Sequence, residues 1–379
     1  MVEILADRES VSPLQPDRPN RKRPVSRDGV IDLVGAAVAS LAAVWLVLSL
    51  AGVKFGFGYV FCWAVVSYAL YGVLVWRRDG VLIMKERLAT VSIWTGGVIA
   101  LVALLGVVAY VVAKGFPEVY DSFPQFLVND TTGGKSGVAF GVGPAIVGTL
   151  EQVGIAALIS IPIAFLTATY IVESRSTLAR LVQNTVDAMT GTPSIIAGLF
   201  IYILWVYPHG VNGRSGFVAA ITLSVMMIPV TCRAALEVIR VVPGSLREAA
   251  LAIGAPQWRV ALRIVLPTAR AGLITAAILG VARTAGETAE VLFTAGGGPH
   301  YNWNPFHGEQ DDLPLRIYEQ VFQPSAKAIS VGWGAAFVLM TLVLTLFILA
   351  RLLGRGGSRR SFSLWGFITS WRRSPPVSE

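Results

Sequence analysis

The chain has 379 residues, of which 54% are hydrophobic and only 14% are charged, and it carries a formal net charge of +8. A soluble domain of this size would carry roughly 25% charged residues. This composition, with a mean hydropathy of +0.64, therefore excludes a soluble globular protein and predicts a polytopic membrane protein. The basic residues are dispersed and lack an interleaved aromatic platform, which argues against nucleic-acid binding, and attraction to anionic lipid headgroups accounts for them.

Residues 1–29 form a basic segment interrupted by four prolines. A segment this polar cannot bury a core, so we predict a disordered cytoplasmic tail. Apolar segments long enough to cross a hydrocarbon core of about 30 Å as helices follow. We predict eight spans: 31–52, 57–76, 92–113, 141–171, 187–207, 217–239, 267–295 and 331–353. Residues 356–379 form a second basic cytoplasmic tail.

Most lysines and arginines lie in the N-terminal tail, in residues 77–91, 172–186 and 240–270, and from Arg351 onward. Because positive residues stay on the cytoplasmic side, both termini and residues 240–270 are predicted to face the cytoplasm. The turn-rich segments 114–140 and 296–330 then lie outside, either as docking sites for an external binding protein or as passive loops. The cysteine and histidine spacings predict neither a disulfide framework nor a metal site.

The motif Gly191-Thr192-Pro193-Ser194 stands at the opening of the fifth predicted span. Thr192 as N-cap and Pro193 as first helical residue make an ordinary helix start. A helix N-terminus is also an anion site, so Thr192 and Ser194 are candidate residues of a substrate path.

Arg233 is predicted near the inner end of the sixth span, one turn after Pro229, which would kink the helix. The planar fork of guanidinium donors suits a tetrahedral oxyanion. The alternative is that Arg233 snorkels to the headgroups. Glu237, one turn further, could neutralise it.

Residues 240–266 are too short and too charged to span a membrane. Glu248-Ala249-Ala250 continues a helix and Gly254 allows a turn, so we predict a helix, a turn and a second helix. The small apolar surface of the first helix suits a cleft on another protein; it consists of Ala249, Ala250, Leu251, Ala252 and Ile253.

Arg283 and Glu287 are four residues apart on the seventh predicted span, so they share a helix face and can pair. A charge near mid-bilayer costs at least about 2.5–3.5 kcal/mol and normally faces a bundle interior, a cavity or a partner. The pair is read either as the lining of a translocation path or as a salt bridge that orients the bundle. Glu151 and Glu290 are further acidic residues within spans, and they either pair with a neighbour or remain protonated.

Two sets of motifs resemble known families. Glu248-Ala249-Ala250, Gly254 and Ile264-x-Leu266-Pro267 resemble the cytoplasmic coupling loop of ABC-importer permeases. The following segments resemble phosphate-specific permeases of the PstA type: Ala282-Arg283-Thr284-Ala285-Gly286-Glu287-Thr288-Ala289, Leu292-Phe293-Thr294-Ala295, Met227-Ile228-Pro229 with Arg233, Pro144 to Thr149 and Pro193-Ser194-Ile195. The similarity covers roughly residues 90–355. Glu151 and Glu290 depart from it, since an aliphatic residue and a proline are expected there.

The resemblance implies an all-α type I ABC importer permease core of six spans over 90–355, preceded by an extra N-terminal transmembrane hairpin over 30–76. Such a chain is a non-catalytic subunit that transports inorganic phosphate with a PstC-type permease, two copies of a PstB-type ATPase and an external PstS-type phosphate-binding protein. The charged path residues of the family map onto Arg233, Arg283 and Glu287. ATPase coupling maps onto Glu248, Ala249, Ala250, Gly254, Leu266 and Pro267.

No cofactor is expected on this chain, because its sequence contains no P-loop motif; ATP-Mg is expected on the partner ATPase. Three alternatives remain open: a permease for another oxyanion such as sulfate or molybdate, the PstC-type half of the phosphate system, and an ion-coupled secondary transporter that needs no ATPase.

Overall fold

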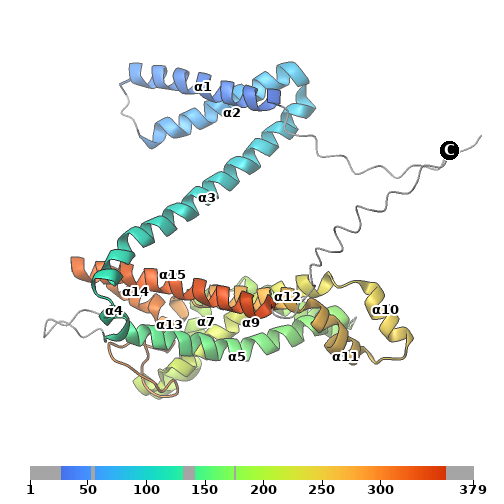
Figure 1. Cartoon of the computed structure of the whole chain (residues 1–379), viewed down its shortest axis with the longest axis vertical. Coiled ribbons are helices and arrows are strands. Elements are labelled where there is room, and N and C mark those ends of the chain that lie inside the picture. The colour runs from blue at the N-terminus through green and yellow to red at the C-terminus, as the bar shows by residue number, and fades with distance from the viewer. Residues whose placement is uncertain (1–26, 53–55, 131–140, 175, 356–379) are drawn as a thin grey trace, which may run out of the picture. The chain divides into compact units, whose positions relative to one another are not determined.

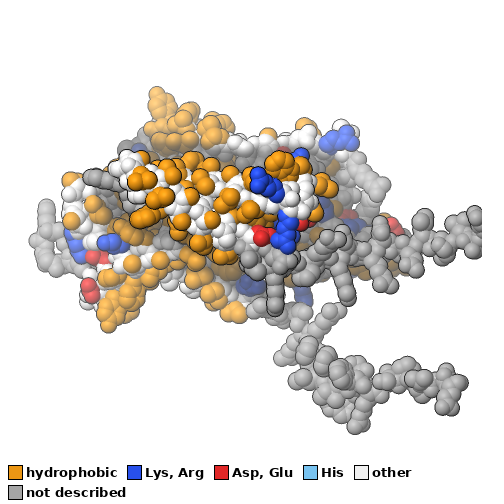
Figure 2. Space-filling view, turned by 90° about the horizontal axis from the view of Figure 1, so that it is seen from above, with side chains coloured by type: hydrophobic (Ala, Val, Ile, Leu, Met, Phe, Trp, Pro, Cys, Tyr) orange, Lys and Arg blue, Asp and Glu red, His pale blue; other side chains and the backbone are white. Residues whose placement is uncertain are grey.

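The structure is a computed structural model that describes residues 27–52, 56–130, 141–174 and 176–355. The tails predicted over 1–29 and 356–379 lie outside these residues, apart from residues 27–29. The described part is helical, with two isolated bridges and no strand. It contains seven helices long and apolar enough to cross a membrane, and a bent pair that makes an eighth candidate. Figure 2 shows hydrophobic side chains over much of the helical surface that faces the viewer.

The chain divides into two compact units, Met1–Gly106 and Val107–Glu379. The first unit contains α1 (Arg27–Leu50), α2 (Phe57–Asp79) and the first part of α3 (Val81–Asp121). Two polar contacts join α1 to α2: the Ser40 and Ser67 hydroxyls lie 2.6 Å apart, and the Trp63 indole N–H donates to the Ala37 carbonyl at 2.9 Å. These contacts satisfy polar groups that would otherwise face lipid.

The second unit is built on four long helices that run side by side: α5 (Gly143–Glu173), α9 (Gly216–Arg240), α12 (Leu266–Thr284) and α15 (Ala326–Arg355) (Figure 1). Small residues let these helices approach closely, as is usual in membrane bundles. A Cβ atom on Gly272 would collide with Val238, and one on Gly280 would collide with Thr231. Both contacts join α12 to α9, and their order shows that the two helices are antiparallel.

The fifth predicted span, 187–207, is wrong as a continuous helix. The chain forms α6 (Thr177–Thr190) and then turns by 101° into α7 (Ser194–Ile201), which continues through η1 (Tyr202–Val206), α8 (Tyr207–His209) and η2 (Gly210–Gly213). Pro193 causes the break, because its ring disfavours helical geometry at the residue before it. The predicted N-cap is also wrong: Pro193 occupies the N-cap position of α7, and the Thr192 hydroxyl donates backwards to the Ala188 carbonyl at 3.4 Å.

The seventh predicted span, 267–295, is likewise interrupted. α12 ends at Thr284, and α13 (Ala289–Thr294) begins after a tight turn. In that turn the Gly286 N–H donates to the Arg283 carbonyl at 3.2 Å, and the Glu287 N–H donates to the Thr284 carbonyl at 3.1 Å. Glu287 therefore lies in the turn after α12, and only Arg283 lies on the helix itself.

The segment between α13 and α15 closes one end of the bundle, next to α4 (Gln125–Val128), and it includes α14 (Leu313–Val321). Asp312 caps α14 by accepting the Leu315 N–H at 2.7 Å. The buried Arg316 guanidinium donates from Nε to Asp311 Oδ2 at 2.8 Å. Burial raises the pKa of the Asp311 carboxyl to about 6, although Arg316 favours the charged form.

Candidate substrate path and coupling site

Arg233 lies on α9 and is held by α6. Its Nη2 is 3.2 Å from Asp187 Oδ1, and its Nη1 donates to Thr190 Oγ1 at 3.3 Å. Glu237 pairs with Arg240 at 3.2 Å, so the prediction that Glu237 neutralises Arg233 is wrong. Helical spacing suggested Glu237, whereas the charged partner that the fold supplies is Asp187 of α6, and the Thr190 hydroxyl, 43 residues before Arg233, adds a hydrogen bond. The Arg233 side chain is nevertheless 57% exposed.

Arg283 and Glu287 pair, as predicted, with Arg283 Nε 3.7 Å from Glu287 Oε1. This long distance indicates a loose contact, because a strong charge-assisted hydrogen bond is about 2.7–2.9 Å. The Arg283 side chain is 59% exposed and that of Glu287 is 20% exposed. Arg283 therefore keeps most of its donors free for another group.

The two arginines lie on neighbouring helices at similar depth. Gly280 of α12 meets Thr231 of α9. On α9, Arg233 follows Thr231 by two residues. On α12, Arg283 follows Gly280 by three residues. Because the helices are antiparallel, these two offsets point in opposite directions and add. At 1.5 Å per residue, the two positions are separated by about 7.5 Å along the helix axes. Each of these exposed cations within a spanning helix needs cover from another group, since neither can face lipid cheaply.

Thr192 and Ser194 remain candidate path residues by position only. They lie at the bend between α6 and α7, beside Thr190, which does contact Arg233. Within the described residues, no hydrogen bond or ion pair joins Thr192 or Ser194 to Arg233 or Arg283.

The two unexpected acidic residues have different surroundings. The Glu151 carboxylate accepts from the Gln310 side-chain amide at 2.6 Å, so it pairs with a neighbour. Glu290 on α13 is fully buried, and neither of its carboxyl oxygens has a hydrogen-bond partner among the described residues. Its backbone packs against Gly198 of α7, where a Cβ would lie 2.9 Å from the Glu290 Cα.

Replacing Glu290 by glutamine should leave assembly and uptake intact. A buried carboxylate without hydrogen bonds is costly when ionised, so a neutral isostere of the same size should be accepted. The measurement is the thermal unfolding midpoint of the detergent-solubilised complex, expected to be unchanged or higher in Glu290→Gln. A clear fall in the midpoint would mean that the carboxylate is required. Glu290→Lys, which places a positive charge at the same buried position, should lower the unfolding midpoint and serves as the comparison.

The helix, turn and helix predicted within residues 240–266 is confirmed as α10 (Gly244–Ala252) followed by α11 (Gln257–Val260), which runs through η3 (Ala261–Val265) into Leu266 and Pro267 of α12. Gly254 adopts a positive φ of 85°, as its position in the turn requires. Glu248, Ala249, Leu251 and Ile253 are exposed. Ala250 is only 5% exposed and packs into the core, so its predicted place on the exposed surface is wrong.

Arg247, at the middle of α10, fixes this helix to the bundle. Its Nε donates to Glu173 Oε1 at the end of α5 at 2.9 Å. Its Nη1 and Nη2 donate to the carbonyls of Val242 and Ile239, at the end of α9, at 2.8 and 3.0 Å. Both charged side chains are about four-fifths buried. No sequence pattern pairs Arg247 with Glu173, because the contact joins elements that are far apart in the chain.

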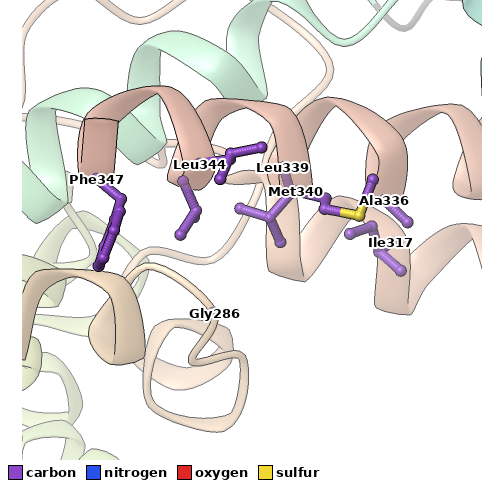
Figure 3. A pocket seen from close by; sticks show the side chains of 8 residues that line it. Gly286, Ile317, Ala336, Leu339, Met340, Leu344 and Phe347 are labelled. Atoms are coloured by element: carbon purple, nitrogen blue, oxygen red, sulfur yellow. The ribbon is translucent and has the colours of Figure 1, made fainter. Parts of the chain in front are cut away.

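Two cavities in the described part of the chain are apolar and do not resemble an anion site. A groove of about 530 Å³ lies beside the turn after α12 and is lined mainly by α15, with Leu339, Met340 and Phe347 pointing into it (Figure 3). A second cavity of about 340 Å³ between α5, α12 and α15 is equally apolar. Neither includes Arg233 or Arg283, so the polar path cannot be completed by these cavities.

Comparison with known proteins gives a consistent family. Residues 160–358 match the family described as the binding-protein-dependent transport system inner membrane component. The chain is 37% identical over 283 residues to "Phosphate transport system permease protein PstA 1" of Mycobacterium tuberculosis (strain CDC 1551 / Oshkosh), covering 73% of this chain and 91% of that protein. It is 38% identical over 263 residues to the PstA protein of Mycobacterium leprae, covering 69% and 85%.

Among solved structures, the chain resembles a bacterial ABC transporter involved in the import of the acidic polysaccharide alginate. The sequences are 16% identical, the TM-score is 0.49, and the match covers 72% of this chain and 96% of that one.

Proposed function

This chain belongs to the PstA family of phosphate transport permeases, within the binding-protein-dependent transport system inner membrane components, and we propose that it is the transmembrane permease subunit of an ATP-driven inorganic phosphate importer. The predicted all-α polytopic membrane fold of an ABC importer permease is confirmed. Six candidate spans form the permease core, counting α6 with α7 as one, and α1 and α2 precede them.

The observation that carries the proposed transport of phosphate is the pair Arg233 and Arg283, exposed on adjacent spanning helices. Guanidinium groups bind tetrahedral oxyanions through several parallel hydrogen bonds. Two of them at similar depth lower the electrostatic barrier for phosphate, and the nearby Glu287 keeps binding weak enough for release. Thr192 and Ser194 at the bend before α7 add polar groups to the path.

A second permease covers the exposed arginines in this proposal. We assign that place to a PstC-type subunit, which completes the path from the opposite side. Two PstB-type ATPases bind ATP-Mg on the cytoplasmic side, and a PstS-type protein delivers phosphate from outside. This chain then holds no cofactor and performs no catalysis itself. It lies in the bacterial plasma membrane with both termini in the cytoplasm, as the distribution of basic residues predicts.

Coupling to the ATPase follows from the exposed side of α10 and the turn at Gly254. Closure of the ATPase dimer moves Glu248, Ala249 and the neighbouring apolar residues of α10. Arg247 passes this movement to the ends of α5 and α9, and Leu266 and Pro267 pass it into α12. The spans then rock so that the path opens alternately outward and inward.

The test is transport by the whole complex in proteoliposomes, with ATP-Mg inside and the binding protein outside. Uptake of labelled phosphate, sulfate and molybdate is measured together with ATP hydrolysis. We expect phosphate alone to stimulate hydrolysis and to be taken up. An equal response to all three anions would favour a general oxyanion permease, and uptake without hydrolysis would favour an ion-coupled secondary transporter.

Gly254→Trp should separate an ATPase-coupled permease from a secondary transporter. The positive φ at residue 254 strains any side chain, by about 1–2 kcal/mol, and an indole at this exposed turn would obstruct a docked ATPase. We expect loss of ATPase from the purified complex and loss of uptake. Gln257→Trp, which adds the same side chain at an exposed helical position nearby, is the matched control. Undiminished uptake by Gly254→Trp would contradict coupling through this loop.

A further inference from the structure

We infer that Asp187 on α6 is a positioning residue that holds Arg233 and limits how tightly the inner part of the path retains phosphate. This inference rests on the proposed function and adds a residue to it. Asp187 belongs to none of the motifs that identify the family in this sequence, and it reaches the path only because α6 folds back against α9.

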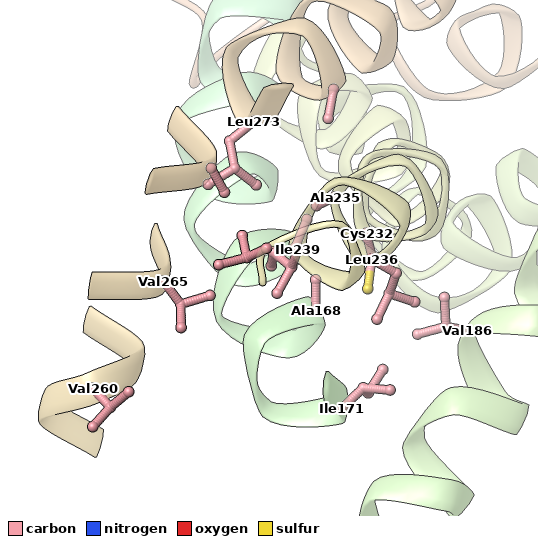
Figure 4. Packing of buried hydrophobic residues seen from close by; sticks show 14 of the residues in the cluster. Ala168, Ile171, Val186, Cys232, Ala235, Leu236, Ile239, Val260, Val265 and Leu273 are labelled. Atoms are coloured by element: carbon pink, nitrogen blue, oxygen red, sulfur yellow. The ribbon is translucent and has the colours of Figure 1, made fainter. Parts of the chain in front are cut away.

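The packing of α6 fixes the position of Asp187. The preceding residue, Val186, is 5% exposed and lies in the buried cluster that contains Cys232 and Leu236 of α9 (Figure 4). Asp187 therefore emerges at the edge of that cluster, directly beside Arg233. The buried Val186 therefore fixes the backbone of α6 beside α9, and the Asp187 carboxylate reaches Arg233 Nη2 at 3.2 Å.

Thr190 completes the hold on Arg233. Its hydroxyl donates to the Asp187 carbonyl at 2.7 Å, which leaves the oxygen free to accept from Arg233 Nη1. A guanidinium has five N–H groups, and these two contacts use one on each terminal nitrogen. The remaining donors lie on a side chain that is 57% exposed. Arg233 can thus bind an anion while it stays attached to α6.

The charge of Asp187 has a separate consequence for transport. A phosphate that binds the remaining donors of Arg233 shares that guanidinium with the Asp187 carboxylate, which lies 3.2 Å from it, and the two negative charges repel each other. The carboxylate therefore weakens phosphate binding at Arg233 and favours release. Neutralising Asp187 should make this part of the path hold phosphate more tightly and turn over more slowly.

The same buried cluster connects this ion pair to the coupling helices. It also contains Ala250 of α10, Val260 of α11 and Val265 of η3. Figure 4 shows Val260 and Val265 on one side of the cluster and Val186 on the other, with Ile239 and Ala168 between them. A movement of α10 and α11 therefore reaches α6 through packed side chains, and it can change the Asp187–Arg233 distance during the transport cycle.

The test measures inhibition by phosphate inside the vesicles. The whole complex is reconstituted with ATP-Mg inside and the binding protein outside, and initial uptake of labelled phosphate is measured at increasing lumenal phosphate. In Asp187→Asn we expect the half-inhibitory lumenal concentration to fall about two- to fivefold, the range supported by a partly exposed ion pair, with a lower maximal rate. Asp187→Glu, which restores the charge, should return both values toward wild type.

Glu237→Gln is the matched control, because it removes the same charge from the same inner region without touching Arg233. The control should leave the half-inhibitory concentration unchanged. If Asp187→Asn does not assemble, Asp187→Ser removes the charge in a smaller side chain and should show the same fall.

Two results overturn the inference: an unchanged half-inhibitory concentration in the Asp187 variants, or an equal fall in Glu237→Gln. A merely structural role would lower the maximal rate without lowering this concentration. Failure of the proposed function is distinct, because wild type itself would then not take up phosphate. If wild type takes up sulfate or molybdate instead, the same titration with that anion inside the vesicles decides the role of Asp187.

Discussion

Replacing Arg283 by alanine should abolish phosphate uptake while the complex still assembles. The Arg283 guanidinium ends α12, makes only a loose 3.7 Å contact with Glu287 and is mostly exposed in the single chain. In the assembled path, Arg283 and the passing phosphate form a desolvated charge pair. Removing one partner of such a pair costs about 2–5 kcal/mol. A loss of this size in the passage of phosphate corresponds to a fall in uptake of about thirtyfold or more.

The measurement is uptake of labelled phosphate by reconstituted complexes, with subunit composition checked after purification. Arg283→Lys keeps the charge but loses the planar fork, so intermediate uptake is expected. Arg270→Ala removes the same charge near the start of α12, far from the turn, and should retain uptake. Wild-type uptake in Arg283→Ala, with full assembly, would remove Arg283 from the path.

Replacing Arg247 by alanine should uncouple ATP hydrolysis from transport. One guanidinium here joins α10 to two helix ends, through Glu173 of α5 and the carbonyls of Ile239 and Val242 at the end of α9. Hydrogen bonds to charged groups contribute about 1.5–3 kcal/mol each, and these groups are about four-fifths buried. Without them, α10 can move under the ATPase while α5 and α9 stay in place.

The expected result for Arg247→Ala is loss of uptake together with loss of phosphate-stimulated hydrolysis, while basal hydrolysis by the bound ATPase persists. Arg259→Ala is the matched control, since Arg259 is an exposed arginine of the same loop whose guanidinium lies over the Trp258 ring, 5.2 Å from its centroid. Glu173→Gln keeps the shape of the α5 end and should show a weaker form of the same defect. Normal coupling in Arg247→Ala would place the transmission elsewhere, in Leu266 and Pro267.

Periodicity and composition predicted most of the membrane architecture. Long apolar runs gave the positions of α1, α2, α5, α9 and α15, because a chain must satisfy its backbone hydrogen bonds within one helix to cross hydrocarbon. The turn at Gly254 was also predictable from local sequence, since a positive φ strongly favours glycine. Arg283 and Glu287 also meet as their spacing predicts, because a single turn of backbone decides that distance.

A helix start at Thr192–Pro193 was predicted, but the bend of α6 into α7 and the break of the seventh span at Gly286 were not. Apolar residues continue on both sides of each break, so hydropathy alone reads one long segment. Pro193 breaks the helix between α6 and α7, and packing of α7 against α13, with Gly198 against Glu290, stabilises both bends. Pro193 and Gly286 permit a turn, and the tertiary packing of α7 and α13 stabilises it.

The sequence by itself determined that this protein crosses the membrane many times, that residues 240–266 form two short helices joined by a turn, and that cations stand within the spans at Arg233 and Arg283. Each of these properties depends on residues close together in the chain. Only the tertiary structure decided which partners these charges have: Asp187 in place of Glu237 for Arg233, Glu173 for Arg247, and Gln310 for Glu151. Electrostatic pairing depends on distance in space, and the distance between two helices is set by the packing of small and branched side chains that no local pattern records.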